Sequence, residues 1–339
     1  MHIIIPMAGI GSRLKPHTLT VPKPLTLIAG ETIVQRLVEE IVKVVGQTVS
    51  DIGFIIGPAS KGFPADTNLQ LLKIAKNLGA KGHVFIQEEA LGTAHAIYQA
   101  RKLLKGPCVV AFADTLFKAD FTLDSKYDGV IWVKKVANPK AFGVVKLQNG
   151  IITDFVEKPE NFVSDLAIIG IYYFREADKL QFEVNNLIEN DIKGKGGEYQ
   201  LTDALENLKQ KGAKFVPGTV SDWMDNGNKQ VTVDTNRKVL EYTQEAGENL
   251  VSESVVLKNS SIIPPCYIGE NVVLENSTIG PYVSLGDNSK VTNATIKDSL
   301  LQKNVTISNA ELDKAMIGNN VIFNGKFISV SLGDFSELV

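Results

Sequence analysis

The residues best suited to chemistry come directly after the first apolar run, in the segment MAGIGSRLKPHTLTVPKPL, residues 7–25. Gly9 and Gly11 leave backbone N–H groups open to a large anion, because neither residue carries a Cβ atom. Arg13 adds a fork of donors that suits phosphate oxygens, and Lys23 adds a point charge on a stretch stiffened by a proline on either side. We therefore predict that this segment, called the phosphate loop below, binds a polyphosphate.

The phosphate loop follows neither of the two common phosphate-binding patterns. It lacks the GK[ST] ending of a P-loop and the third glycine of G-x-G-x-x-G. A Gly-x-Gly pair by itself can also be a mere tight turn. Features elsewhere in the chain are therefore needed to distinguish a polyphosphate-binding loop from a tight turn.

Alternating strands and helices are expected to position the loop. The predicted strands are 2–6, 50–57, 83–87 and 108–114, and the predicted helices are 31–45, 68–78 and 92–104. This alternation is typical of βαβ units in a largely parallel sheet. After residue 114 the texture changes, and antiparallel additions are predicted, with Asn149-Gly150 as a hairpin turn. The additional strands are expected at 129–136, 142–150, 151–158 and 167–174.

A different pattern begins near residue 250. An aliphatic residue recurs about every six positions, with Gly, Asn, Asp or Ser between, as in the hexapeptide repeat of a parallel β-helix. Each turn of such a fold buries aliphatic side chains against the turns above and below. We predict an α/β domain at 1–235, a linker helix at 236–250 and a β-helix domain at 251–339.

Composition excludes several classes of function. The chain has 339 residues and a formal net charge of −3, without a stripe of Arg and Lys, so we expect no nucleic-acid partner. No apolar run approaches the roughly 20 residues of a membrane span, and the N-terminus lacks the features of a signal peptide, so we expect no membrane partner and a cytoplasmic protein. Cys108 and Cys266 are far apart in sequence and suggest neither a disulfide nor a metal site.

Nine short motifs carry a family resemblance. They are PMAGIGSRLKPHT (6–18), PKPL (22–25) followed by Gly30, QEEALGTAHA (87–96), Ala113-Asp114, FGVV (142–145), VEKP (156–159), IGIY (169–172), GEYQLTD (197–203) and WMDNG (223–227). In this order they resemble the motifs of the sugar-1-phosphate nucleotidylyltransferases, the family of glucose-1-phosphate thymidylyl- and uridylyltransferases. The resemblance implies a Rossmann-like, mixed and mainly parallel sheet in a nucleotidyltransferase domain, followed by a left-handed parallel β-helix.

The resemblance also implies a reaction. The phosphate of a hexose 1-phosphate, with glucose 1-phosphate favoured, attacks the α-phosphorus of dTTP or UTP and gives an NDP-sugar and pyrophosphate. Attack of one anion on another needs charge neutralisation and in-line positioning. Arg13 and Lys23 are the implied catalytic residues, while Asp114 and Asp225 would hold Mg²⁺, a hard ion suited to carboxylates.

The remaining motif residues are implied to recognise the substrates, a nucleoside triphosphate and a sugar 1-phosphate. The nucleotide set is Ala8, Gly9, Gly11, Ser12, Gln87 and Gly92, and the sugar-phosphate set is Gly143, Glu157, Lys158, Ile168 and Gly170. Glu157-Lys158 alone could be a solvated turn. Asp203 and Asp222 are left outside the metal site, and His17 and His95 are interpreted as structural.

Other interpretations stay open. The base is undetermined, because Pro24 replaces a glutamine found in many thymidylyltransferases and LGTAHA looks closer to branches that use UTP. In bifunctional relatives a left-handed β-helix is an acyltransferase that needs a general base, usually His, but all four histidines here precede residue 100. We therefore favour assembly or regulation for the β-helix and expect a homo-oligomer. A regulatory subunit without activity is disfavoured, since the implied catalytic and metal residues are retained.

Overall fold

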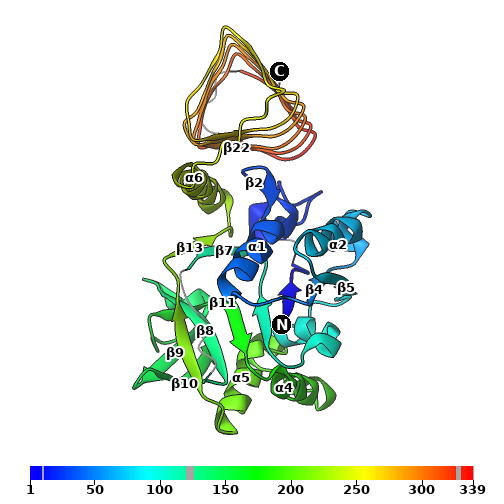
Figure 1. Cartoon of the computed structure of the whole chain (residues 1–339), viewed down its shortest axis with the longest axis vertical. Helices are drawn as coiled ribbons and strands as arrows, with labels where there is room; N and C mark the ends of the chain where they lie inside the picture. Colours follow the sequence, from blue (N-terminus) through cyan, green and yellow to red (C-terminus); the bar gives the residue numbers. More distant parts are fainter. Residues whose placement is uncertain (10, 120–125, 326–329, 339) are drawn as a thin grey trace. The chain divides into compact units, whose positions relative to one another are not determined.

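A computed structural model of the chain describes residues 1–9, 11–119, 126–325 and 330–338. The chain, coloured along its sequence in Figure 1, divides into two compact units, each made of two separate stretches. Unit 1 consists of Met1–Gly9 and Gln35–Trp223, and unit 2 of Ile10–Val34 and Met224–Val339. The phosphate loop is thus divided, because its first residues follow a strand of unit 1 and the remainder belongs to unit 2.

Unit 1 is built on a mixed, mainly parallel sheet, as predicted. Four parallel strands lie in the order β5-β4-β1-β6, and β11 continues the sheet antiparallel to β6. Ile3, Ile4 and Ile5 are completely buried, as expected of a strand covered on both faces. The strands of this sheet are β1 (His2–Pro6), β4 (Asp51–Ile56), β5 (Lys81–Ile86), β6 (Cys108–Ala111), β8 (Gly129–Lys135), β9 (Gly143–Gln148), β10 (Ile151–Glu157), β11 (Leu166–Phe174) and β12 (Phe215–Thr219).

The antiparallel additions also follow the prediction. β9 pairs with β10 through a turn in which Asn149 and Gly150 have φ values of 53° and 79°. Two residues with positive φ give the turn whose twist matches that of the flanking strands. Two further short strands, β7 (Thr115–Lys118) and β13 (Asp222–Asp225), pair with each other, and the chain passes from unit 1 to unit 2 within β13.

Helices pack on the sheet of unit 1 and complete its core. Ile97, Leu180 and Leu205, one from each of three helices, are fully buried in the same apolar cluster as Ile4 and Val110 of the sheet. The helices are α1 (Ile33–Val45), which begins in unit 2, α2 (Thr67–Asn77), α3 (Thr93–Gln99), α4 (Ala177–Glu189) and α5 (Leu201–Gln210).

The helix predicted at 92–104 is shorter than expected. The α-helix ends at Gln99, and a 3-10 turn follows at Arg101–Leu103. The amide of Leu103 bonds to the carbonyl of Ala100, and the side chain of Gln181 donates to the carbonyl of Arg101 at 2.6 Å. A tertiary hydrogen bond from α4 therefore takes an acceptor that a longer helix would have used internally.

Unit 2 contains a helix and two short strands besides the β-helix. α6 (Lys229–Glu245) begins after Asn228, whose side chain accepts a hydrogen bond from the amide of Val231 as an N-cap. It therefore starts before the range 236–250 expected for a linker helix. β2 (Leu27–Ile28) and β3 (Glu31–Thr32) form a two-stranded antiparallel ribbon at the end of the 10–34 segment.

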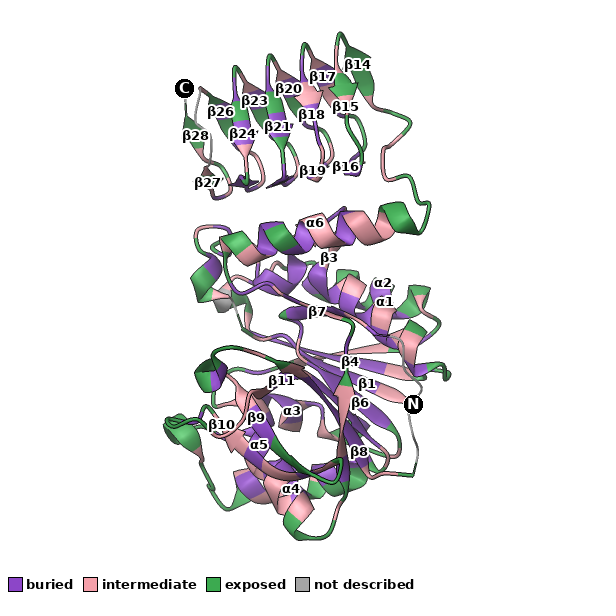
Figure 2. Cartoon of the chain, turned by 90° about the vertical axis from the view of Figure 1, so that its left-hand side faces the viewer, coloured by how far each residue is buried: buried purple, intermediate pink, exposed green. Residues whose placement is uncertain are grey.

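Three parallel sheets form the left-handed β-helix of unit 2. Figure 1 views the coils end on as a triangle, and Figure 2 shows their strands side by side. Paired residues are 17 positions apart in the first coils, as for Val256 and Val273, and 15 apart in the last, as for Ile322 and Glu337. Each coil therefore uses slightly fewer residues than three hexapeptides.

Each of the three sheets of the β-helix forms one side of the stacked coils. The first consists of β14 (Val256–Lys258), β17 (Val273–Glu275), β20 (Lys290–Thr292), β23 (Thr306–Ser308), β26 (Ile322–Asn324) and β28 (Glu337–Leu338). The second consists of β15 (Ser261–Ile262), β18 (Thr278–Ile279), β21 (Thr295–Lys297) and β24 (Glu311–Asp313). The third consists of β16 (Cys266–Ile268), β19 (Val283–Leu285), β22 (Ser299–Leu301), β25 (Met316–Ile317) and β27 (Ser331–Leu332).

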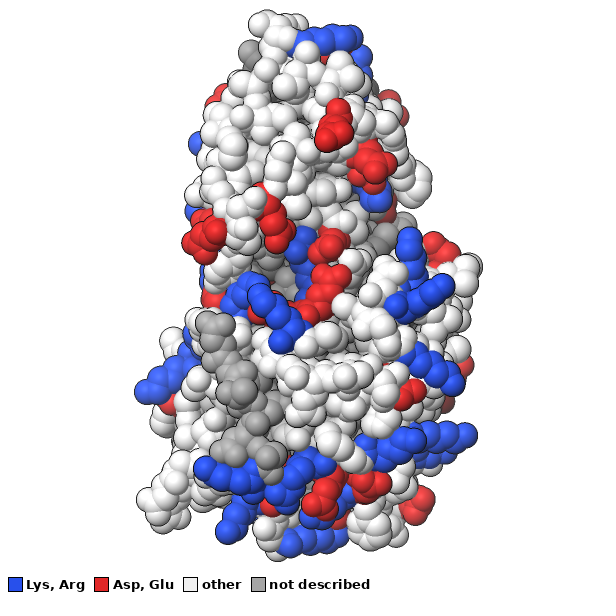
Figure 3. Space-filling model, in the orientation of Figure 1, with Lys and Arg blue, Asp and Glu red and all other residues white. Residues whose placement is uncertain are grey.

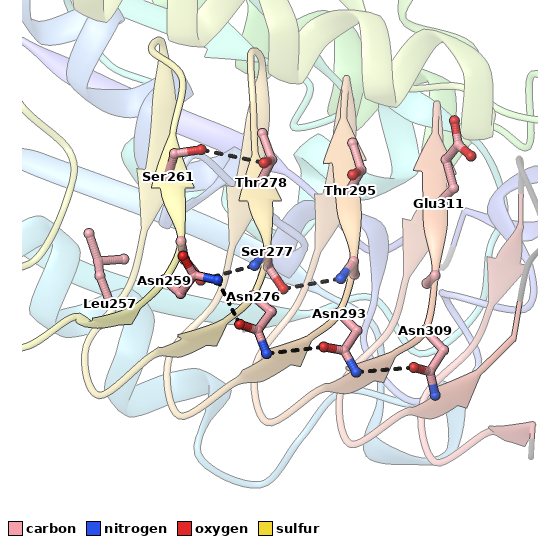
Figure 4. Close-up of a pocket in the computed structure, with 13 residues that line it drawn as sticks. Leu257, Asn259, Ser261, Asn276, Ser277, Thr278, Asn293, Thr295, Asn309 and Glu311 are labelled. Atoms are coloured by element: carbon pink, nitrogen blue, oxygen red, sulfur yellow. Dashed lines mark hydrogen bonds between the residues drawn. The ribbon is translucent and has the colours of Figure 1, made fainter.

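Stacked asparagines form one corner of the β-helix. The side-chain amides of Asn259, Asn276, Asn293 and Asn309 form a hydrogen-bonded ladder, with N···O distances of 2.9, 3.3 and 3.3 Å (Figure 4). All four have φ values near 50°, in the left-handed region that asparagine tolerates better than most residues. The recurrent Asn of the repeat is therefore explained by the turn that each coil must make.

Candidate functional site

Several predicted site residues of unit 1 follow the carboxyl ends of neighbouring parallel strands. Ala8 and Gly9 come after β1, Gln87 comes after β5, and Asp114 comes shortly after β6. Backbone hydrogen bonds continue between these strand ends: the amide of Gln87 donates to Ile56, and the amide of Ala113 donates to Pro6. Open α/β sheets bind ligands along this edge, so the sheet brings these residues to a suitable place.

Gln87 is held by the segment that follows it. Its side-chain nitrogen donates to the carbonyl of Gly92 at 3.2 Å and lies 3.1 Å from Nδ1 of His95. Gln87 is buried, and burial also lowers the pKa of His95 below its ordinary value, with Glu89 opposing the shift. A neutral His95 can accept the Gln87 hydrogen bond. The histidine interpreted as structural from sequence therefore contacts a predicted nucleotide-binding residue.

Two motifs far apart in sequence pack together around Gly92. A Cβ atom placed on Gly92 would lie 2.4 Å from the carbonyl oxygen of Tyr199, and Gly92 has a φ of 115°. Only glycine fits this position without strain. The amide of Ala94 donates to the same carbonyl at 2.9 Å, and the hydroxyl of Thr93 accepts from the amide of Leu201 at 2.8 Å. The segments 87–96 and 197–203 therefore act as one structural element.

The predicted sugar-binding residues converge around Gly143. Gly143 pairs with Glu157 across β9 and β10, and its missing Cβ would lie 3.0 Å from Oε2 of Glu157 and 3.3 Å from Cδ1 of Ile168. Thr202 completes the group, because its hydroxyl donates to Oε2 of Glu157 at 3.3 Å. The Glu157 carboxylate, the methyl group of Thr202 and the Ile168 side chain therefore pack closely around Gly143. Thr202 was not among the residues predicted for the sugar site, and its place in the GEYQLTD motif is the one signal for it in the sequence.

The other two predicted sugar-binding residues lie on strained or irregular backbone. Lys158 has a φ of 41°, and its ammonium lies 3.5 Å from the Glu157 carboxylate. Gly170 has a φ of 82° at an irregularity in the pairing of β11 with β8, and its carbonyl accepts from the amide of Phe112 at 2.9 Å. Phe112 is two residues before Asp114. Gly170 therefore ties β11 to the strand end that bears the predicted metal ligand.

Asp203 belongs to the surroundings of this group. Burial raises the pKa of Asp203 above its ordinary value, and the nearby Glu157 carboxylate raises it further. The Oδ2 atom of Asp203 is buried and has no hydrogen-bond partner among the described residues. Two carboxyl groups thus influence one another here.

In unit 2 the phosphate loop is folded tightly on itself. Gly11 has a φ of 74°, and a Cβ atom placed there would lie 2.7 Å from the Cβ of Lys23. The hydroxyl of Thr18 donates to the Gly11 carbonyl at 2.8 Å, while Ser12 and Arg13 lie in an exposed 3-10 turn. Lys23 is 5% exposed and therefore held in a fixed environment. The structure thus brings the two predicted catalytic residues into one compact loop.

Asp225 lies at the end of β13 in unit 2. Its backbone carbonyl accepts from the hydroxyl of Thr235 at 3.1 Å, so α6 fixes the position of its backbone. The next residue, Asn226, is completely buried, and neither atom of its side-chain amide has a hydrogen-bond partner among the described residues. An unsatisfied buried amide costs roughly 1–3 kcal/mol, which singles out Asn226 as a residue that sequence reasoning missed.

The predicted site residues are therefore grouped within each unit. Unit 1 holds the base-facing and sugar-facing residues together with Asp114, and unit 2 holds the loop residues from Gly11 to Lys23 together with Asp225. Within the described ranges, no three His, Cys, Asp or Glu side chains gather as a metal site would require by itself.

The surface carries charges of both signs. On the face shown in Figure 3, Lys and Arg side chains are interspersed with Asp and Glu rather than gathered in one continuous band. Among the described residues, none of the helices combines the length and the apolar character that crossing a bilayer requires.

A groove of about 930 Å³ follows the asparagine corner of the β-helix, with Ser261, Thr278 and Thr295 on one wall (Figure 4).

Comparison with known proteins identifies related sequences. The family model described as nucleotidyl transferase matches residues 2–242. The bifunctional protein GlmU of Methanococcus maripaludis is 30% identical over 274 residues, which cover 78% of this chain and 62% of that protein. The glucose-1-phosphate thymidylyltransferase of Streptomyces griseus is 27% identical, with 79% of this chain and 78% of that protein covered. The chain spans about three fifths of the length of its GlmU relatives.

A solved structure shares the fold. The crystal structure of UDP-glucose pyrophosphorylase complexed with UDP-glucose aligns with a TM-score of 0.57 at 23% identity, covering 71% of this chain and 98% of that one. At this level of identity the similarity concerns the fold.

The environment of His17 predicts a pH dependence of stability. Burial lowers the pKa of His17 to about 4, Asp334 opposes the shift, and Lys229 adds to it. Because the folded state excludes a proton that the unfolded chain takes up below about pH 6.5, stability is present above that pH and is lost as the pH falls towards 4. We expect the unfolding midpoint of His17→Gln to fall less than that of the wild type between pH 6.5 and 4. Identical pH profiles would contradict this assignment.

Proposed function

The chain belongs to the nucleotidyl transferase family, and on that premise we propose that it is a sugar-1-phosphate nucleotidylyltransferase. It would transfer NMP from dTTP or UTP to a hexose 1-phosphate, with glucose 1-phosphate preferred. An NDP-sugar and pyrophosphate would be the products. Amino-sugar and mannose 1-phosphates are the alternative acceptors. We also propose Mg²⁺ as the cofactor, a homo-oligomeric enzyme, and a nucleotidyltransferase domain followed by a β-helix domain, with the linking helix at Lys229–Glu245 rather than at 236–250.

The observation that carries this proposal is the group of residues around Gly143. Oε2 of Glu157 lies 3.0 Å from the position that a Cβ atom of residue 143 would have, and Cδ1 of Ile168 and the methyl group of Thr202 each lie 3.3 Å from it. The hydroxyl of Thr202 donates to the same Glu157 oxygen, so carboxylate, hydroxyl and apolar groups meet here. A sugar ring presents both hydroxyl groups and C–H surfaces, so it matches such a mixed lining. The base would be recognised by Gln87, whose side chain is held by Gly92 and His95.

The proposed chemistry requires neutralisation of charge. An oxygen of the sugar phosphate forms a bond to the α-phosphorus, and the bond from that phosphorus to the bridging oxygen breaks, so that pyrophosphate leaves with the electron pair. Arg13 would bind the leaving pyrophosphate, and Lys23 would lie against the reacting phosphates. Fixed charges are effective in this role because they need no rearrangement during the reaction. The contact between Gly11 and Lys23 supports a fixed position for this lysine.

The donor atoms present suit Mg²⁺. Asp114 and Asp225 offer carboxylates, and Mg²⁺ in nucleotide-dependent enzymes is commonly held by one or two carboxylates together with substrate phosphates and water. Next to Asp225, the buried side-chain amide of Asn226 has no hydrogen-bond partner among the described residues. We propose that bound ligands supply its partners. A bound Mg²⁺ would neutralise phosphate charge, and we propose that Asp114 and Asp225 hold it.

A second activity in the β-helix is the weaker alternative. The relatives named bifunctional make it worth considering, and an acyltransferase would need a general base beside its substrate amine. The groove along the asparagine corner is lined by Asn, Ser and Thr with Glu311 as its one acidic residue among the described ones. Because none of the described residues that line the groove is a histidine, the groove does not favour this alternative.

The proposed function is tested by pyrophosphate release with Mg²⁺. Five nucleoside triphosphates (dTTP, UTP, CTP, GTP and ATP) are assayed against glucose, N-acetylglucosamine, galactose and mannose 1-phosphates. We expect the highest kcat/KM with dTTP or UTP and glucose 1-phosphate. A preference for another sugar would correct the acceptor, and silence of folded protein across all pairs would contradict the proposal.

Replacement of Lys23 tests its catalytic role. We expect Lys23→Ala to lower kcat by a factor of about 10²–10³, because a preorganised charge on a transferring phosphate contributes on the order of 3 kcal/mol. Lys15→Ala is the matched control, since Lys15 is an exposed lysine of the same loop. Thermal unfolding of both variants monitors folding. Turnover of a folded Lys23→Ala variant near that of the wild type would remove Lys23 from this role.

Replacement of Asp225 tests the metal assignment. We expect Asp225→Asn to raise the Mg²⁺ concentration for half-maximal activity at least about tenfold, because a neutral amide is a weaker ligand than a carboxylate. Asp222→Asn is the control, since its carboxylate accepts a hydrogen bond from the amide of Trp223 on the same strand. If the Mg²⁺ titration of Asp225→Asn matched that of the control, Asp225 would not be a ligand.

A further inference from the structure

One sheet of the β-helix differs from the other two in how its outward side chains are covered. This sheet, β16-β19-β22-β25-β27, is called the covered sheet below. Its outward row, in register from coil to coil, is Tyr267, Ser284, Leu300, Met316 and Ser331. Ser284, Leu300 and Met316 are at most 2% exposed, although they alternate with the residues that fill the coil core. Other parts of the protein must therefore lie against this row.

The 10–34 segment contacts this row at its N-terminal coils. The ring of Tyr267 lies against Gly30, where a Cβ atom would be 2.2 Å from the ring. Ser284 donates at 2.6 Å to the side-chain oxygen of Asn236, which also accepts from the amide of Ala29 at 3.3 Å. Between these coils and the last one, Gln302 donates to the carbonyl of Leu27 at 3.1 Å. The chain that follows the phosphate loop is thus held on consecutive coils.

The last coil contacts the phosphate loop itself. Nε2 of His17 lies 2.9 Å from the hydroxyl of Ser331, and the hydroxyl of Thr20 donates to the carboxylate of Asp334. Between these two hydrogen bonds Gly333 packs on Pro16, with space for no side chain: an added Cβ would lie 2.9 Å from the proline Cβ. Three contacts within four residues of the β-helix therefore hold residues 16–20.

The β-helix supplies these contacts from a rigid base. Oδ1 of Asp334 accepts a hydrogen bond from the backbone amide of Asn319 at 2.6 Å. The preceding coil therefore fixes the carboxylate that accepts the hydrogen bond from the Thr20 hydroxyl. Residues 16–20 are in turn bonded to the rest of the loop through Thr18, whose hydroxyl donates to Gly11, and Gly11 lies against Lys23. A displacement of the last coil would therefore be passed to the segment between Gly11 and Lys23, which includes Arg13.

We propose that Ser331 and Asp334 are positioning residues, through which the last coil of the β-helix orders the phosphate loop. The ordered loop aligns Arg13 and Lys23 with the nucleoside triphosphate. This inference rests on the proposed function for its catalytic consequence. It gives the β-helix a direct part in nucleotide binding, in addition to any role in assembly or regulation. The sugar 1-phosphate is bound by residues of the other unit and should be affected less.

The test removes the two hydroxyl groups that join loop and coil. The double variant Thr20→Val/Ser331→Ala is compared with the control Thr306→Val/Ser308→Ala. The control also removes one threonine and one serine hydroxyl, but from β23, away from the loop contacts. We expect the first variant to raise KM for the triphosphate and lower kcat by about tenfold or more, while KM for the sugar phosphate changes less than threefold. The control is expected to match the wild type, and Thr20→Ser, which keeps the hydroxyl, should restore the Thr20 contribution.

Amide hydrogen exchange in the peptide covering residues 11–25 provides a readout that does not depend on turnover. Faster exchange is expected in the loop variant and not in the control. Unchanged exchange, or faster exchange with unchanged KM for the triphosphate, would overturn the positioning role. An equal rise in KM for the triphosphate and for the sugar phosphate would also overturn it. So would the same loss of activity in the control variant. Inactive wild-type protein would instead contradict the proposed function, while the exchange result would still decide whether the coil orders the loop.

Discussion

The parallel stacking of coils in the β-helix is the constraint on which unit 2 depends. Backbone hydrogen bonds between successive coils place equivalent residues in straight rows, such as the row from Tyr267 to Ser331. A row of this kind is a rigid surface with a fixed spacing, because moving one coil would break its bonds to both neighbours. The 10–34 segment has little regular structure of its own and takes its conformation from this surface.

The two units divide the candidate site by the kind of group each supplies. Unit 1 offers strand ends and the carboxylate of Glu157 in a lining suited to a sugar, held by ordinary sheet pairing. Unit 2 offers the cationic loop, in which Gly11 adopts a positive φ and Lys23 is almost fully buried. Burying a lysine is costly unless its surroundings are preorganised, so a loop that contains one needs external support. The β-helix supports the loop through hydrogen bonds to His17 and Thr20.

Local patterns predicted most of the fold. The β-branched runs gave the parallel strands, Asn149-Gly150 gave the hairpin, and the six-residue recurrence gave the β-helix, because each depends on residues close in sequence. Boundaries were predicted less well: the helix at 92–104 ends early, since Gln181 from α4 takes a carbonyl of Arg101. The motif residues of the sugar site were predicted as a set, yet Thr202 and the support of Gln87 by His95 emerged only from packing.

The sequence alone determined the fold class, the repeat and the chemical character of the phosphate loop, because glycine, arginine and lysine at these spacings have the same properties wherever the loop lies. The tertiary structure alone decided what holds that loop. His17 contacts Ser331, which is 314 positions away in sequence, and a side chain at Gly333 would collide with Pro16. Contacts at such separation leave no periodicity to detect, since a single serine or glycine in a repeat looks like any other until the coils are stacked.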